Sequence, residues 1–204
     1  MTTPRDLLIV TFDMEPVRPV ERGDLSLGLA GAEMIDLLGA EVVSLDGDSV
    51  VPGQKRAMHD ALLDEAVSSL HREVPYEPVG EWLWRRGRDL SAHYLDVFTE
   101  EGQLTREEGR RWVVLKSSHT ELVDSPARRR AAERWRADEP VLATLAAAVG
   151  IRDKRTGDAE VPADDQVVTV LNAVDDALAE LAEERRQRAR RQEQAASDNR
   201  WRGY

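Results

Sequence analysis

Residues 25–51, LSLGLAGAEMIDLLGAEVVSLDGDSVV, place a long apolar segment directly before an alternating one. The first segment repeats apolar residues at helical spacing, at Leu27, Ala30, Met34 and Leu37, with Leu29, Ile35 and Leu38 beside them. This stripe nearly encircles a helix, which predicts that the helix is buried on most of its sides. Asp24 is placed to cap the start of this helix, and Gly39 is placed to end it.

The second segment has the signature of a β-hairpin. Apolar residues at positions 42, 43 and 45 precede the pair Asp46-Gly47, and Val50-Val51 follow it. An aspartate-glycine pair suits the positive φ angles of a tight turn. We therefore predict a hairpin over residues 42–51 that continues directly from the buried helix.

Helical periodicity covers most of the remaining chain. Further helices are expected over residues 58–70, 78–101 with a break at Gly87, 126–137, 140–149 and 167–184. A second hairpin is expected over residues 112–123, where two apolar runs flank a polar turn. The predicted fold is mostly α, a single helical domain over residues 1–184 with two short β-hairpins. Residues 185–204 are expected to form a basic helix end and, from residue 192, a disordered tail.

Length and composition limit the class of protein. With 204 residues and 41% apolar content, the chain can bury one sizeable core. The absence of cysteine excludes disulfides, thiolate metal sites and a cysteine nucleophile, and it indicates a reducing compartment. No segment reads as a signal peptide or as a spanning helix, so we expect a cytoplasmic protein with at most peripheral membrane contact. The 25 arginines against 3 lysines are typical of a bacterial genome rich in G and C.

Charge is unevenly distributed along the chain, whose net charge is −11. Residues 1–84 carry 6 basic and 16 acidic side chains, a net of −10, whereas residues 85–204 carry 22 and 23. Basic residues gather at positions 85–88, 110–111, 128–130 and 185–191. This segregation suits a molecule with one face toward an anionic surface, although arginine-rich helices with solvated faces give the same pattern.

Motifs of the common enzyme classes are missing. The sequence lacks a phosphate loop, a dinucleotide fingerprint, a serine elbow and a paired-histidine zinc helix. His59 near Asp60 and Asp64 resembles an acid–base or metal cluster, but acidic helix surfaces bring such residues together by chance. Asp46-Gly-Asp48 lacks the later ligands of a calcium loop. We therefore expect no catalytic residue, no metal and no cofactor.

The buried helix and its hairpin, with TPRDLLIV at residues 3–10 before them and LLDEA at residues 62–66 after them, resemble the Golgi phosphoprotein 3 family. The resemblance extends over roughly residues 3–182. That family consists of mostly helical peripheral membrane proteins that recognise phosphatidylinositol 4-phosphate, and bacterial relatives share the fold. The resemblance implies a non-enzymatic protein whose partner is an anionic phospholipid or membrane surface, with a protein partner or self-association as a further expectation.

The same resemblance implies where a lipid headgroup would bind. The family places two pocket arginines one turn apart; counting back from Gly102, Arg88 matches the first and Ser91 occupies the second place. Arg85 and Arg86, beside Arg88, are the candidates to replace the lost donor. Lipid headgroup binding is therefore assigned to Arg88, Arg85 and Arg86.

Two further pocket positions lie around the first buried helix. Registered on Gly28-Leu29, the family's tryptophan and its third arginine are replaced by Glu21 and Ala30. One of four headgroup-binding groups is thus retained, and a carboxylate stands where it would repel phosphate. The resemblance therefore implies a degenerate pocket.

The second expected hairpin resembles the apolar loop that the family uses for membrane insertion, and it is likewise preceded by a glycine-x-leucine-threonine step, here Gly102 to Thr105. An indole and three apolar residues lie between cations, a composition suited to an anionic headgroup region. The residues concerned are Arg110, Arg111, Trp112, Val113, Val114, Leu115 and Lys116. The alternative is a core-packed strand with a solvated turn. A strand also alternates its faces, so only about half of these residues could enter lipid.

Three functions remain in competition. The first is a peripheral membrane protein on the inner face of the cell membrane, with the arginines of residues 185–191 as an additional contact. The second is a soluble helical scaffold or regulatory interaction protein that has lost lipid binding. The third is a winged-helix-like DNA binder, which the net charge of −10 over residues 1–84 disfavours because phosphate contacts dominate DNA affinity. No nucleic acid partner is therefore expected.

Overall fold

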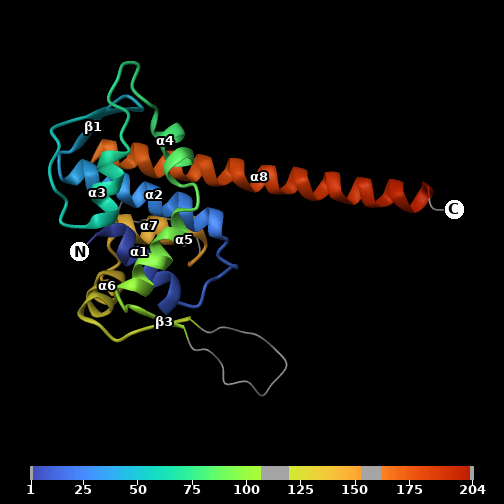
Figure 1. The fold of residues 1–204 in the computed structure, drawn as a ribbon, viewed down its shortest axis with the longest axis horizontal. Helices are drawn as coiled ribbons and strands as arrows, with labels where there is room; N and C mark the ends of the chain where they lie inside the picture. The colour runs from blue at the N-terminus through green and yellow to red at the C-terminus, as the bar shows by residue number, and fades with distance from the viewer. Residues whose placement is uncertain (1, 107–119, 153–161, 203–204) are drawn as a thin grey trace.

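Eight helices and two pairs of strands make up the described part of the chain, residues 2–106, 120–152 and 162–202 of a computed structural model (Figure 1). In chain order they are α1 (Thr3–Asp13), α2 (Arg22–Gly39), β1 (Val43–Asp46), β2 (Ser49–Pro52), α3 (Ala61–Ser68), α4 (Val79–Arg86), α5 (Leu90–Glu100), β3 (Leu104–Arg106), β4 (Thr120–Leu122), α6 (Pro126–Arg136), α7 (Pro140–Val149) and α8 (Asp165–Arg202). The expected mostly α fold with two short antiparallel strand pairs is confirmed.

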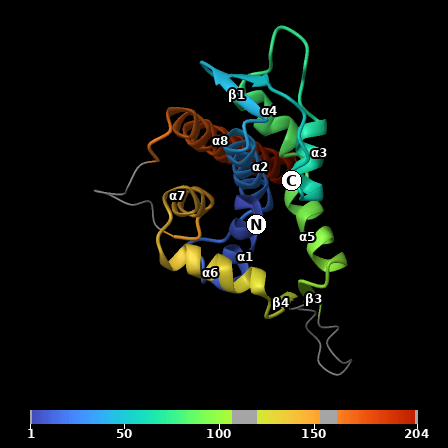
Figure 2. The ribbon, with the colours of Figure 1, turned by 90° about the vertical axis from the view of Figure 1, so that its left-hand side faces the viewer.

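Helix α2 runs through the centre of the domain, and 14 of its 18 residues are buried. Helices α1, α3, α4, α5, α7 and α8 all contact it. In Figure 2, α7 and α8 lie on one side of α2, and α3 and α5 lie on the other. Neighbours on every side thus cover the apolar stripe that nearly encircles this helix. A helix so enclosed cannot enter a DNA groove, which removes the winged-helix interpretation.

Capping residues account for several helix boundaries. The Asp60 carboxylate accepts hydrogen bonds from the backbone N–H groups of Leu62 and Leu63 at 3.0 and 3.2 Å, which starts α3. The Ser125 hydroxyl accepts from the Arg128 N–H at 3.1 Å, and a proline follows it at the first position of α6. The break near Gly87 separates α4 from α5, as the sequence predicts.

The first turn of α2 corrects one prediction. The helix begins at Arg22 with Glu21 as its N-cap residue, so Asp24 falls within the first turn instead of capping it. Asp24 is 4% exposed, and its carboxylate pairs with Arg18 at 2.9 Å and with Arg185 of α8 at 2.5 Å. Arg18 also donates to the carbonyl of Ala148, at the end of α7, at 3.0 Å. One buried carboxylate therefore connects α2, α7 and α8.

The two strand pairs differ in how well the sequence predicts them. Strands β1 and β2 pair as expected around Asp46-Gly47, with Gly47 at a φ of +61°. Strand β4 lies within the second predicted hairpin, but its partner is β3, with Leu104 opposite Leu122. The strand expected at residues 112–115 lies outside the described residues. Leu104 is 3% exposed, so burial of its side chain favours this pairing.

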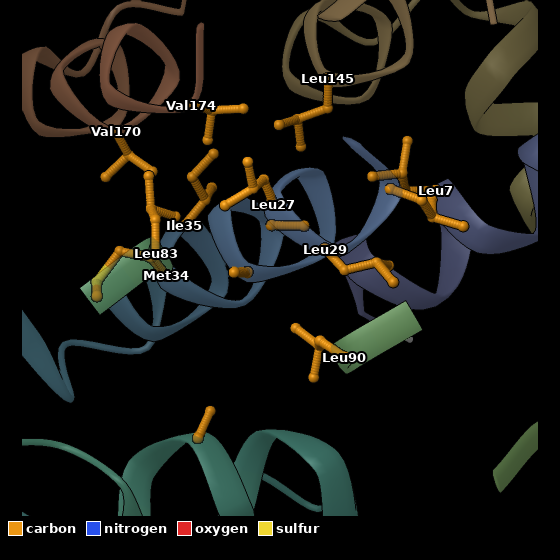
Figure 3. Packing of buried hydrophobic residues seen from close by; sticks show 14 of the residues in the cluster. Leu7, Leu27, Leu29, Met34, Ile35, Leu83, Leu90, Leu145, Val170 and Val174 are labelled. Carbon is orange, nitrogen blue, oxygen red and sulfur yellow. The ribbon is translucent and has the colours of Figure 1, made fainter. Parts of the chain in front are cut away.

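Two glycines of α2 allow the neighbouring helices to approach closely. A methyl group at Gly31 would lie 2.3 Å from Cγ2 of Val174 on α8, and one at Gly28 would lie 2.6 Å from Cγ1 of Val149 on α7. Figure 3 shows Val174 and Leu145 pointing from α8 and α7 toward the apolar side chains of α2. Any side chain at these two positions would separate the layers of the core.

Helix α8 extends further than expected. The apolar stripe predicted for this helix is buried at Leu171, Val174 and Leu178, and Val170 is buried beside it. The helix does not end where the apolar stripe ends, near Glu184, but continues to Arg202, whereas the sequence predicts disorder from residue 192. Every side chain from residue 186 to 195 is exposed, and this segment projects well beyond the other helices (Figure 1).

The close approach at Gly31 gives a test of the packing. Gly31→Ala should lower the free energy of unfolding by about 1–3 kcal/mol, because the added methyl group overpacks the α2–α8 contact. Gly39→Ala is the matched control, since no atom lies within 4 Å of a Cβ added there, and it should be neutral or stabilise by up to about 1 kcal/mol. Urea unfolding of both variants measures the difference; equal effects would contradict the packing described.

Candidate functional site

The junction of α2, α4 and α5 holds most of the residues that the sequence assigns to headgroup binding. At Gly87 the chain passes so close that an added Cβ would lie 2.6 Å from the carbonyl oxygen of Leu83 and 3.5 Å from that of Ser26. The Ser26 hydroxyl donates to the Ser91 hydroxyl at 2.9 Å and accepts from the Ser91 N–H at 3.0 Å. The Ser91 hydroxyl in turn donates to the carbonyl of Arg22 at 3.1 Å. These bonds fix the start of α5 against the first turn of α2.

Two cations are exposed at this junction. Arg88 lies three residues before Ser91, and Arg22 carries the carbonyl that Ser91 binds. Both side chains are exposed, and within the described ranges neither has a hydrogen-bond or ion-pair partner. A guanidinium group presents five N–H donors that match the oxygen atoms of phosphate. The exposed carboxylate of Glu21, next to Arg22 in the chain, opposes an anion at this place.

Arg86, by contrast, is used inside the protein. It donates from Nε and Nη2 to the two carboxylate oxygens of Glu33 at 2.7 and 2.8 Å, and from Nη2 to the carbonyl of Leu62 at 3.1 Å. The Tyr94 hydroxyl donates to the same carboxylate at 2.9 Å. Glu33 is fully buried in the middle of α2, so it requires these partners.

The electrostatics of this buried group follow from its enclosure. Burial raises the pKa of Glu33, and the hydrogen bonds from Arg86 and Tyr94 offset part of that rise. Burial and the adjacent carboxylate raise the pKa of Tyr94 well above its ordinary value. Burial also acts to lower the pKa of Arg86, but the contacts with Glu33 outweigh it and the net pKa is raised. Arg86 therefore remains a cation bound to Glu33.

Arg85 is paired as well, at the surface. Its Nε and Nη2 atoms donate to the carboxylate of Glu77 at 2.7 and 2.6 Å. Of the three arginines expected to bind a headgroup, Arg88 alone lacks a partner in the part of the chain that the structure describes. The local sequence does not distinguish these neighbours, because the carboxylates that bind them lie elsewhere: Glu77 in the loop before α4 and Glu33 in α2.

Comparison with known proteins identifies the fold. The sequence model of the Golgi phosphoprotein 3 family matches residues 4–198, nearly the whole chain. The chain belongs to the Golgi phosphoprotein 3 family. None of the curated proteins matched it. The family is one of non-enzymatic adaptors whose members bind lipids and proteins.

The structure places the four pocket positions expected from the Golgi phosphoprotein 3 family in different environments. Ser91 is 3% exposed, and its hydroxyl is engaged with α2. Ala30 is fully buried in the core, so its position offers no donor to the surface. Glu21 and Arg88 are exposed. Arg22, which the sequence comparison did not single out, is the additional exposed cation at the junction.

The membrane hairpin expected from the family, Arg110 to Lys116, lies outside the described residues. The described part contains no group of histidine, aspartate and glutamate side chains able to hold a metal ion. Asp60 and Asp64 were suspected beside His59. Asp60 caps the start of α3, and the Asp64 carboxylate accepts a hydrogen bond from the Met58 N–H at 2.9 Å. Along the described ranges, no helix combines the length and the apolar character needed to cross a bilayer.

A set of long-range ion pairs was not expected from the sequence. Carboxylates from residues 1–84 pair with arginines from residues 85–204 as Asp6–Arg134 (3.0 Å), Asp13–Arg128 (2.6 Å), Asp24–Arg185 (2.5 Å) and Glu33–Arg86 (2.7 Å). Charge that is segregated along the sequence is thus partly neutralised in the fold. The signal available in the sequence was the presence of carboxylates, such as Glu33, inside an apolar stripe, since such a carboxylate needs a partner.

The buried pair makes a prediction that separates Arg86 from Arg85. Arg86→Met should lower the free energy of unfolding by about 3–5 kcal/mol, because it leaves Glu33 buried without its cation. Arg85→Met, which breaks a pair whose arginine side chain is 44% exposed, should cost no more than about 1 kcal/mol.

The pH dependence of the same variants checks the cause. Burial raises the pKa of Glu33, so acid pH protonates this carboxyl in the folded protein and removes the unpaired charge. The deficit of Arg86→Met should therefore be largest near neutral pH and shrink as the pH falls. Denaturant unfolding across pH measures it, and a deficit independent of pH would mean that lost packing is responsible.

Proposed function

We propose that this protein is a non-enzymatic adaptor that binds an anionic membrane surface through the exposed cations at the junction of α2 and α5. The observation that carries the proposal is the state of Arg88, which is exposed and without a partner among the described residues while its neighbours Arg85 and Arg86 are paired. Arg22 adds a second cation at the same junction. Two guanidinium groups provide charge-assisted donors for phosphate oxygens.

Membership of the Golgi phosphoprotein 3 family supports the adaptor role, since the family binds lipids and proteins. The residues at the junction favour weak recognition of a general anionic surface over recognition of one phosphoinositide. Ser91 and Ala30 are buried where the family would place donors, and Glu21 adds a negative charge. In a cell the protein would then act as a peripheral protein on the inner face of the membrane.

The segment from Arg110 to Lys116 would form a second contact with the membrane. Its indole and apolar residues would enter the interface while its cations meet headgroup phosphates. Strands β3 and β4, at the edge of the domain, begin and end the chain section that contains this segment.

A second candidate function is a helical scaffold that binds protein partners and has lost lipid binding. The pairing of Arg85 with Glu77 and of Arg86 with Glu33 favours it, because those arginines cannot replace the missing pocket donors without breaking ion pairs. The two candidates differ in their binding to vesicles.

The vesicle test compares two variants in which neighbouring arginines are replaced by uncharged glutamine. Arg88→Gln should weaken binding to anionic vesicles about fivefold, because a cation near an anionic leaflet contributes roughly 1 kcal/mol. Arg85→Gln is the matched control and should change binding less, since Glu77 already neutralises Arg85. Co-sedimentation with vesicles matched in total charge, with and without phosphatidylinositol 4-phosphate, measures both effects. A parent protein that ignores all anionic vesicles supports the scaffold instead.

The second contact has its own test. Replacing Trp112 and Leu115 by aspartate should weaken vesicle binding, because buried apolar area and electrostatic attraction act together at an interface. A folded double variant that binds vesicles as well as the parent would exclude this segment from the mechanism, and circular dichroism confirms the folding.

A further inference from the structure

Helix α8 is divided into two halves of opposite charge. Residues 165–184 carry six acidic side chains and no basic one, whereas residues 185–202 carry seven basic and two acidic side chains. The change of sign occurs between Glu184 and Arg185, near the point where the helix leaves the domain. Helix-dipole complementation acts only in the first and last turns. Within the helix, Glu183 pairs with Arg186 at 3.4 Å and Glu184 with Arg188 at 3.9 Å, whereas Asp176 and Glu180 have no partner among the described residues.

The projecting part of α8, residues 186–202, is here called the arm. All its described side chains, from residue 186 to 195, are exposed. A helix of this length that is polar on every side has little stability of its own, because helical stability in proteins comes mostly from packing. A helix of this kind gains stability when it packs against another surface.

An open groove of about 410 Å³ lies between α4 and the first half of α8. Its wall contains Trp84, a 36% exposed indole, together with the carboxylates of Asp176 and Glu180. In the described structure neither carboxylate has a hydrogen-bond or ion-pair partner. The groove thus combines an aromatic face with free negative charges, which is suited to guanidinium groups.

The spacing of charges on the arm matches the spacing in the groove. Asp176 and Glu180 lie four residues apart on α8, and Arg186 and Arg190 are likewise four residues apart. At about 100° per residue the four positions fall within an arc of about 120°, with Asp176 and Arg190 near its middle and Glu180 and Arg186 at its edges. When two such helices run antiparallel, a single register places Asp176 opposite Arg190 and Glu180 opposite Arg186.

We infer that two copies of this chain associate through antiparallel α8 helices, each inserting its arm into the α4–α8 groove of the other. Two-fold symmetry doubles every contact, giving four ion pairs from the two facing pairs of residues. Each arm also brings its arginines to Trp84 of the other copy. The residues that form this pairing, on α8 and α4, are different from Arg22 and Arg88, the cations of the proposed function.

The composition of the arm favours a second copy over a lipid surface. Its arginines are distributed around the helix, and no apolar face is available to enter a bilayer. An anionic surface at the arm would also face the acidic first half of α8. A second copy brings each basic arm against an acidic first half, because the charges run in opposite order along two antiparallel helices.

The first measurement is the mass of the full chain in solution. At about 0.05 M salt and protein concentrations up to about 100 μM, sedimentation equilibrium should give twice the chain mass of 22.9 kDa. At about 1 M salt, where the Debye length is about 3 Å, the mass should fall to that of one chain. A parent that stays monomeric at low salt overturns the inference.

The decisive experiment uses two charge-reversed variants. The arm variant Arg186→Glu with Arg190→Glu and the groove variant Asp176→Arg with Glu180→Arg should each be monomeric, because like charges then face one another and weaken dimerisation at least about 100-fold. An equimolar mixture of the two should form a heterodimer, since every reversed arm meets a reversed groove and every native arm meets a native groove. A mixture that stays monomeric contradicts the proposed register. This test compares the mixture with each variant alone, so it does not require either variant to be as stable as the parent.

A control variant separates the face of the arm from its total charge. Arg188 lies on the opposite side of the helix from Arg190, two residues away, and carries the same charge. Arg190→Glu should weaken the dimer, whereas Arg188→Glu should change it little. Equal loss from both would indicate general electrostatic attraction and overturn the specific pairing. Loss of vesicle binding by the arm variant, with a monomeric parent, would assign the arm to the membrane instead.

Discussion

A helix enclosed by neighbours must have each of its buried polar groups met by a particular partner, and this constraint organises the structure around α2. Ser26 meets Ser91 of α5, Asp24 meets Arg185 of α8, and Asp36 accepts from the Thr3 N–H of α1 at 2.7 Å. Apolar packing alone would let the neighbouring helices slide, since many registers bury similar area. The polar contacts select one register for each neighbour. These contacts contribute more to the specificity of packing than to net stability, because the desolvation energy lost on burying an ion pair offsets much of its electrostatic attraction.

The same constraint determines which arginines remain for function. Arg86 and Arg185 belong to clusters that look equally basic in the sequence, yet both are fixed to carboxylates of α2. The surface that can meet an anion is therefore much smaller than the arginine content indicates. In this protein, an arginine is a candidate for binding an external anion only when it forms no ion pair with a carboxylate of the fold. Arg88 meets that condition within the described residues.

Local signals predicted the elements well. The encircling apolar stripe predicted the burial of α2, Asp46-Gly47 predicted the first hairpin, and the proline after Ser125 predicted the start of α6. Signals that depend on distant partners failed. Leu104 pairs with Leu122 across residues that the local pattern assigned to another strand, and Asp24 binds Arg185 instead of capping its own helix. The candidate site shared this limit, because the state of Arg85 and Arg86 depends on Glu77 and on Glu33, which lies 53 residues away.

The contact of Asp24 with Arg18 and Arg185 has a mechanical consequence. It holds α8 where the helix leaves the domain, so it acts as the fulcrum of a long lever. The lever beyond this point is about 25 Å long for 17 residues at 1.5 Å per residue, so a rotation of about 10° would move its tip by about 4 Å. Asp24 also lies two residues after Arg22, in the same helical turn as the exposed cation. A small displacement of that turn would thus be magnified at the far end of α8.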